Sequence, residues 1–211
     1  NILLEYSLPT AYDVSSCSYE NTFFSGAGLD PRSMAFNTNG TKLFIYDQTG
    51  NYSVKQYSLN SAYNLSNATL EKQYTGTASE TLKEIEQFAQ GMAFSADGTK
   101  MYLTGDKEDN VVEFTLSTPF DLSDVTKEGA YSVAGEITKM SGIAFSADGL
   151  KMFITDFSNG ASDKDVTEFD LTCGFGVIKC IDPTANKDDV ASVESQSEGA
   201  KKLIQHTTFP V

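Results

Sequence analysis

A stretch of fourteen residues occurs three times in this chain of 211 residues. The copies read SMAFNTNGTKLFIY (33–46), GMAFSADGTKMYLT (91–104) and GIAFSADGLKMFIT (142–155). Each copy places an Asn-Gly or Asp-Gly pair between two short apolar runs. This is a strong hairpin signal, because Gly adopts positive φ without steric cost. The sequence therefore predicts three hairpins of the same design.

A second motif follows each hairpin. It reads LLEYSLPTAYDVSS (3–16), SVKQYSLNSAYNLSN (53–67) and VVEFTLSTPFDLSD (111–124), with a partial fourth copy, VTEFDLT (166–172). Leu4, Tyr6 and Leu8 share one face of this segment and Glu5 lies on the other, which predicts a strand with one better-buried face. A loop then leads to a fourth strand, which we expect to end near Tyr19, Tyr74 and Tyr131 in the three full copies.

Four antiparallel strands in a repeat of this length are typical of a propeller blade. A lone four-stranded sheet buries neither face, whereas stacked blades bury both. A flat sandwich is the alternative, but it does not require such near-identical copies. The small residues that open the first strands (Ser33, Gly91 and Gly142) fit an innermost position around an axis. We predict an all-β chain, a β-propeller of four-stranded antiparallel blades, with about three to four blades represented and a short helix after them.

The predicted boundaries follow the repeats. A partial blade covers 1–30, full blades cover 31–88 and 89–140, and a partial blade covers 141–172. The segment 173–211 forms a cysteine-bounded turn and a helical tail. Because residues 2–8 align with a third strand, we expect a larger propeller. Its missing part would come from upstream blades or from other copies that pair with the apolar edge at Asn1.

Two family resemblances accompany these motifs. AFSADGTKMYLT resembles the YVTN-type propeller repeats of bacterial and archaeal surface proteins, and EFTLSTPFDLSD resembles a repeat of large secreted or phage-tail proteins of marine bacteria. The segment DPTANKDDVASVESQSEGAKKLIQHTTFPV (182–211) is similar to the linker between passenger and barrel in alphaproteobacterial autotransporter-like proteins. These resemblances imply a protein of the bacterial outer-membrane surface, held in the membrane only through a separate C-terminal anchor.

The cysteines suggest an oxidising compartment. Cys173 and Cys180 lie seven residues apart with glycines between them, so a disulfide is expected. A two-cysteine metal half-site is the rival, although the sequence has no second cysteine pair and no histidine cluster. Cys17 falls where Ala68 and Val125 fall in their repeats. We therefore predict that it is reduced and buried.

Charge and histidine content exclude several functions. The net charge of −14, from 29 acidic and 15 basic residues, argues against nucleic-acid binding. The single histidine, His206, lies in the tail, and no glycine-rich phosphate loop is present, so we predict that the chain is not an enzyme. The sequence does not exclude a catalytic pair of carboxylates, because a sequence cannot place two acids together.

The irregular loops between second and third strands are the candidate binding surface, because function on repeat folds concentrates in variable loops. We expect either solvated loops or a surface that docks a protein or holds Ca²⁺, and no other cofactor. A further insertion at 78–90 is expected to contain a helical turn at 81–85. The candidate binding residues are Asp106, Glu108, Asp109, Asp156, Asp163 and Asp165.

The resulting prediction is a non-catalytic extracellular module that binds a protein or cell-surface partner through its loops. The alternative is a structural subunit of a surface assembly, filament or phage tail that is built by edge-to-edge pairing of copies.

Overall fold

The computed structural model describes residues 3–23, 28–105, 109–133, 137, 139–157 and 166–178. They form four antiparallel sheets in chain order. The first contains β1 (Leu3–Ser7) and β2 (Ser18–Phe23), and the second contains β3 (Pro31–Phe36), β4 (Lys42–Asp47), β5 (Ser53–Ser58) and β6 (Thr69–Tyr74). The third contains β7 (Ala89–Phe94), β8 (Lys100–Gly105), β9 (Asn110–Leu116) and β10 (Val125–Ser132). The fourth contains β11 (Met140–Phe145), β12 (Lys151–Asp156) and β13 (Val166–Asp170).

The helices of the described part are short. The turn η1 covers Val14–Ser16 and the helix α1 covers Leu82–Ile85, inside the predicted helical turn. The Glu84 carboxylate accepts hydrogen bonds from the backbone amide and the hydroxyl of Thr81, which stabilises the start of α1. No helix in these described ranges has the length and apolar character needed to span a membrane.

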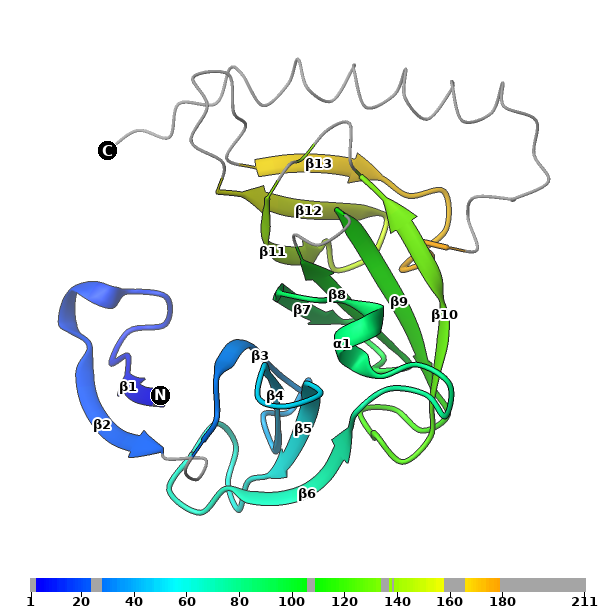
Figure 1. The fold of residues 1–211 in the computed structure, drawn as a ribbon. Coiled ribbons are helices and arrows are strands. Elements are labelled where there is room, and N and C mark those ends of the chain that lie inside the picture. Colours follow the sequence, from blue (N-terminus) through cyan, green and yellow to red (C-terminus); the bar gives the residue numbers. More distant parts are fainter. Residues whose placement is uncertain are drawn as a thin grey trace, which may run out of the picture.

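The sheets are arranged as blades in an open arc, with β3, β7 and β11 on the inner side (Figure 1). These first strands approach one another closely. A Cβ atom on Gly91 of β7 would lie 3.0 Å from the Cα atom of Gly142 on β11. Small residues are therefore required at this inner position, as predicted. The predicted all-β propeller architecture of four-stranded antiparallel blades is confirmed.

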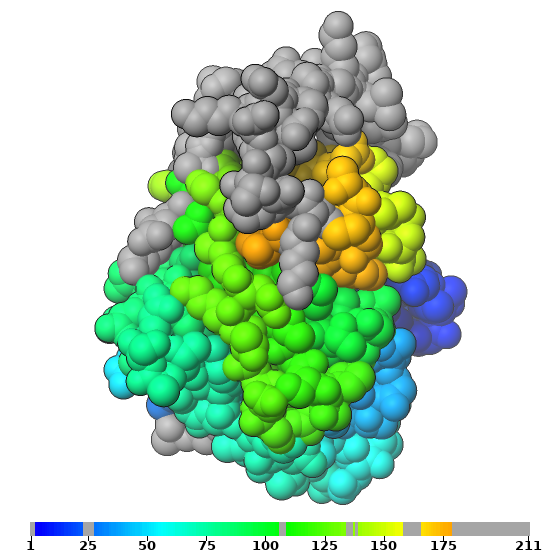
Figure 2. Space-filling view, turned by 90° about the vertical axis from the view of Figure 1, so that its right-hand side faces the viewer, coloured from blue at the N-terminus to red at the C-terminus, as the bar shows by residue number. Residues whose placement is uncertain are grey.

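The second strands β4 and β8 are buried on both faces, because each of their blades packs between two neighbours. In β4, Leu43 and Ile45 belong to the core shared with β1, whereas Phe44 and Tyr46 belong to the core shared with β7–β10. A third core joins β8–β10 to β11–β13. In Figure 2 the second and third blades form a continuous surface, and the N-terminal residues, in blue, lie at one edge.

An aromatic ring from the loop after the third strand packs on the glycine of each predicted Asn-Gly or Asp-Gly turn. Gly98 has φ +73°, and a Cβ atom there would lie 2.1 Å from the Phe120 ring. The Phe120 amide also donates to the Gly98 carbonyl oxygen at 2.9 Å. The pairs Gly40–Tyr63 and Gly149–Phe175 repeat both contacts. Glycine is thus required here for its backbone conformation and for the space beneath the ring.

A carboxylate or amide on each of the third strands β1, β5 and β9 accepts a backbone amide from the segment that packs against its blade. Glu5 accepts from the Leu65 amide at 3.0 Å, Gln56 from the Leu122 amide at 2.9 Å, and Glu113 from the Ile178 amide at 2.8 Å. Glu113 is completely buried and also pairs with Lys100. The sequence predicted that this polar face would be less buried than the opposite face. That prediction is wrong, because the next blade covers it.

The second and third blades are also joined by charge. The Lys72 ammonium on β6 donates to Asp121 Oδ1 at 2.6 Å. Burial alone would raise the pKa of Asp121, but the hydrogen bonds from Lys72 and Ser123 outweigh it and lower the pKa to about 2. Asp121 is therefore ionised at neutral pH, and the pair contributes to the contact between these blades.

The N-terminal sheet departs from two expectations. Leu4 and Tyr6, predicted on the better-buried face of a strand, are exposed. Cys17 is free, but it is exposed rather than buried. The reason is the same in both cases: within the described residues β1 pairs with β2 alone, so this sheet lacks the covering strands that its counterparts have.

Two further predictions, the Cys173–Cys180 disulfide and the tail helix, concern the C-terminal end of the chain. Cys173 is disulfide-bonded. Cys180 lies outside the described residues, as does the whole expected tail helix, so the Cys173–Cys180 pairing and the helix stay predictions.

Candidate functional site

The first, inner strand of each of these blades begins at the same end of the blade at which its second strand ends. At this end, β3 begins with Pro31 opposite Asp47, the last residue of β4, and β11 begins with Met140 opposite Asp156. Loops between second and third strands lie here too, so two of the predicted binding residues, Asp109 and Asp156, are at this end. The other four, Asp106, Glu108, Asp163 and Asp165, lie outside the described residues.

The two described loop acids belong to different blades. Asp156 ends β12, and Asp109 precedes β9 with φ 50°. The Asp109 carbonyl oxygen accepts from the Val133 amide at 2.8 Å, which fixes the loop against the end of β10. In the part of the chain that is described, no three His, Cys, Asp or Glu side chains are grouped to hold a metal ion. The Ca²⁺ prediction for the loops is untested, since most of its residues lie outside that part.

Each inner strand carries a β-bulge close to its beginning. The register shifts between Pro31 and Ser33, between Ala89 and Gly91, and between Met140 and Gly142. A bulge leaves one residue without a partner and turns its side chain away from the regular ladder, a device often found beside active sites. The bulged residues are Arg32, Gln90 and Ser141.

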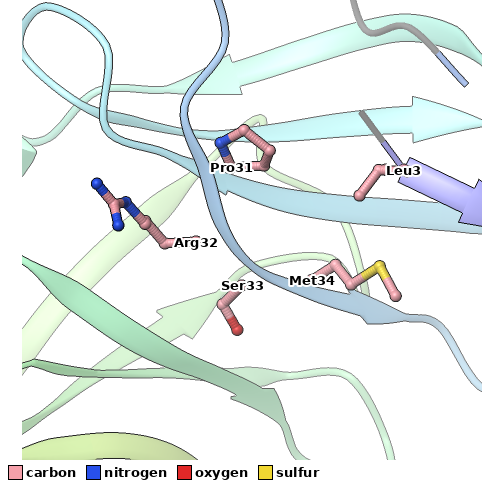
Figure 3. Close-up of a pocket in the computed structure, with 5 residues that line it drawn as sticks. All are labelled: Leu3, Pro31, Arg32, Ser33 and Met34. Carbon is pink, nitrogen blue, oxygen red and sulfur yellow. The ribbon is translucent and has the colours of Figure 1, made fainter. Parts of the chain in front are cut away.

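A cavity of about 410 Å³ lies beside the first of these bulges. It is lined by Leu3 of β1 and by four successive residues of β3, Pro31 to Met34. In Figure 3, Leu3 and Met34 lie together, while Arg32 and Ser33 extend away from them. The cavity therefore has an apolar part and a part with hydrogen-bond donors, which is the usual composition of a small-molecule site.

Arg32 is the only arginine in the chain. Its Nη2 atom donates to Asp30 Oδ2 at 2.8 Å, and both side chains are partly exposed. A guanidinium has five N–H groups, so a contact through one nitrogen leaves donors for a second acceptor. Planar, paired donors of this kind suit carboxylate and phosphate groups.

Asp47 fixes the backbone next to Arg32. Its buried carboxylate accepts from the Asp30 amide at 2.8 Å and from the Lys55 ammonium at 2.8 Å. It also accepts from the hydroxyl and the amide of Thr49. Burial alone would raise the pKa of Asp47, but these hydrogen bonds outweigh it and lower the pKa. The ionised Asp47 thus holds the backbone of Asp30, the residue whose carboxylate pairs with Arg32.

Sequence reasoning missed this site because it looked for acidic loops. One signal was available. Arg32 occupies the position that Gln90 and Ser141 occupy in the other repeats, and it is unique in a chain of net charge −14. A departure from the repeat at an inner position marks a residue that blade packing does not require.

Comparison with known proteins shows the fold. No family model and no curated protein matches the sequence. A solved protein from Lactobacillus plantarum is 15% identical, with a TM-score of 0.50 over 74% of this chain and 44% of that one. Candidate 6-phosphogluconolactonases from Bacteroides fragilis and Bacteroides uniformis are 17% and 18% identical, with TM-scores of 0.48 and 0.46. They match 71% and 81% of this chain and 37% and 46% of their own, so this chain spans less than half of each similar structure.

These comparisons correct the predicted function. Similar structures include candidate enzymes, and none of these three is described as an adhesin or a surface-assembly protein. The predictions of a non-catalytic adhesion module, of an assembly subunit and of no enzymatic role are therefore withdrawn. The exclusion of catalysis depended on the single histidine and on the lack of a glycine-rich phosphate loop in the sequence, although carboxylates, lysine and tyrosine also transfer protons.

At these identities the likeness establishes architecture and nothing finer, and it agrees with the sheets, bulges and inner strands described above: the chain is a series of β-propeller blades.

Proposed function

We propose that the protein binds a small anionic molecule in the cavity beside Arg32 and acts on it there as an enzyme. The observation that carries this proposal is the position of the only arginine. It lies at the bulge of an inner strand and lines a cavity, at a position where the other two inner strands carry Gln90 and Ser141.

The neighbouring groups suit such a ligand. The free N–H groups of Arg32 bind a carboxylate or phosphate in a paired manner, and the Ser33 hydroxyl is a further donor. Leu3 and Met34 cover an apolar part of the molecule. The Asp30 carboxylate, held by Arg32, supplies a proton acceptor next to the bound anion.

The test is isothermal titration of the full chain with 6-phosphogluconate. This compound is the product of a 6-phosphogluconolactonase, the activity in the names of two similar structures. Gluconate, which lacks the phosphate, is the control ligand. We expect 6-phosphogluconate to bind, gluconate to bind more weakly, and Arg32→Gln to weaken 6-phosphogluconate binding by about tenfold or more, as for loss of a charge-assisted pair.

The matched control variant is Lys127→Gln. It removes one positive charge and one ion pair, that with Glu80, on the outer strand β10. Equal weakening by the two variants would show a general charge effect. That result, or binding that Arg32→Gln leaves unchanged, or no binding of either ligand or of inorganic phosphate, contradicts the proposal.

Two finer expectations stay proposals. The extracellular location is supported by the disulfide at Cys173, because disulfides persist in oxidising compartments. The likeness of the hairpins to YVTN-type repeats agrees with the propeller fold, and the autotransporter-linker resemblance concerns residues outside the described ranges.

A further inference from the structure

The N-terminal sheet exposes apolar side chains that the complete blades bury. Tyr6 is 50% exposed, whereas its counterparts Tyr57 and Phe114 are 3% and 0% exposed. The same contrast holds for Leu8 and Val14. Their counterparts, which are all buried, are Leu59, Leu116, Leu65 and Leu122.

The backbone of β1 shows the same difference. The corresponding third strands, β5 and β9, pair on both sides, with β4 and β6 and with β8 and β10. Within the described residues β1 pairs with β2 alone. A bare edge next to an apolar face is a surface that recruits another strand.

The conformation of Tyr12 indicates that the added strand belongs to a hairpin with a glycine in its turn. Its φ is 63°, close to the values of 61°, 51° and 56° at its counterparts Tyr63, Phe120 and Phe175. Each counterpart covers a turn glycine and donates its amide to that glycine. Tyr12 has the same backbone conformation but is 98% exposed. Its ring is therefore already in the conformation that covers a turn glycine in the other blades.

We propose that β1, β2 and Tyr12 form a docking surface for a β-hairpin of this chain's own repeat design. The second strand of the hairpin pairs with the free edge of β1 and covers Tyr6, Leu8 and Val14. The turn of the hairpin places an Asn-Gly or Asp-Gly glycine beneath Tyr12. This proposal is independent of the proposed anion site.

An intact second copy of the chain does not supply such a hairpin. Its three hairpins already lie beneath Tyr63, Phe120 and Phe175, as the contacts of Gly40, Gly98 and Gly149 show. A second copy would have to open one of its own blades, with loss of a buried core. The occupant is therefore a hairpin that is not yet part of a blade.

The test extends the full chain with a copy of its own hairpin. Residues 89–109, which comprise β7, β8 and the loop after them, are joined directly to Ile2, because Asn110 is the counterpart of Ile2. Amide hydrogen exchange of β1 and the chemical reactivity of the Tyr12 ring are measured with and without the extension. We expect the β1 amides to exchange at least about tenfold more slowly and Tyr12 to become protected.

The matched control carries Gly98→Val in the added copy only. A side chain there would collide with the ring, since even a Cβ atom at Gly98 lies 2.1 Å from Phe120 in the native pair. We expect this extension to protect Tyr12 much less. Equal protection by both extensions, or no protection by either, contradicts the proposal. So does an unextended chain that sediments as a dimer with Tyr12 already protected, because a second copy then covers the surface.

A separate measurement covers the case in which the extended chain does not fold. A backbone-cyclised peptide of residues 89–105 presents the hairpin preformed to the unextended chain. Protection of Tyr12 that the Gly98→Val peptide fails to give supports the proposal, and its absence at millimolar peptide contradicts it.

Discussion

At the scale of single residues, the turn glycines show how the repeat determines local structure. Gly98 meets two requirements at once, a φ of +73° and an open space for the Phe120 ring. Gly50 meets only the first, since it has φ +62° and nothing lies within 4 Å of a Cβ atom built there. The two positions therefore separate backbone strain from steric overlap.

Gly98→Ala is expected to destabilise the chain more than Gly50→Ala. The left-handed conformation costs an Ala about 1 kcal/mol at either position, and the overlap with Phe120 adds about 1–3 kcal/mol at Gly98 alone. Urea unfolding of both variants measures the difference. Phe120→Ala in the Gly98→Ala background relieves the overlap, so part of the additional loss in unfolding free energy should be recovered. Equal losses of unfolding free energy in Gly98→Ala and Gly50→Ala would show that the contact with the Phe120 ring does not add to the cost at Gly98.

At the scale of elements, the third strands join one blade to the next. Gln56 and Glu113 occupy equivalent positions and each accepts a backbone amide from the following blade. They differ in charge, and only Glu113 has an ion pair, with Lys100. Lys42, the counterpart of Lys100, instead donates to the Phe120 carbonyl oxygen at 2.8 Å in the next blade.

Glu113→Gln is therefore expected to be tolerated better than Glu113→Ala. The amide oxygen of Gln can still accept from Ile178, as Gln56 does from Leu122, so the loss should be about 1 kcal/mol. Ala removes the acceptor and leaves Lys100 without its partner, with an expected loss of about 2–4 kcal/mol. Unfolding in urea at neutral pH provides the comparison. A Gln variant as unstable as the Ala variant would mean that the stabilising role of Glu113 depends on its ion pair with Lys100 inside the third blade, and not on the amide it accepts from Ile178.

The elements themselves were predictable because their signals are local. An Asn-Gly or Asp-Gly pair between apolar runs specifies a hairpin wherever it occurs, and near-identical copies specify stacked sheets. The burial of Glu113 was not predictable, since its amide partner, Ile178, lies 65 residues further along the chain. The counterparts of Cys17 predicted that it would be buried. It is exposed, because within the described residues β1 pairs with β2 alone and no further strands cover this sheet. The site at Arg32 needs the bulge, which depends on the pairing of β3 with β4.

At the scale of the whole molecule, stability is expected to vary along the arc, because each blade contacts only its neighbours. Among the described residues, the core between the second and third blades has the most members, whereas the core against β1 is small and the far face of β1 is exposed. The middle blades gain apolar burial from both sides and the N-terminal sheet from one.

Native-state hydrogen exchange should show this gradient directly. Amides of β4, β5, β8 and β9 should exchange most slowly and those of β1 and β2 fastest, because local opening of the first sheet exposes little further apolar surface. Tyr46→Ala, which creates a cavity in the core between the second and third blades, should accelerate exchange in both blades together. Leu3→Ala affects only the small core beside β1 and should leave β8 and β9 unchanged. Uniform exchange across all four sheets would mean that the arc unfolds as one cooperative unit and that contacts between neighbouring blades do not set its local stability.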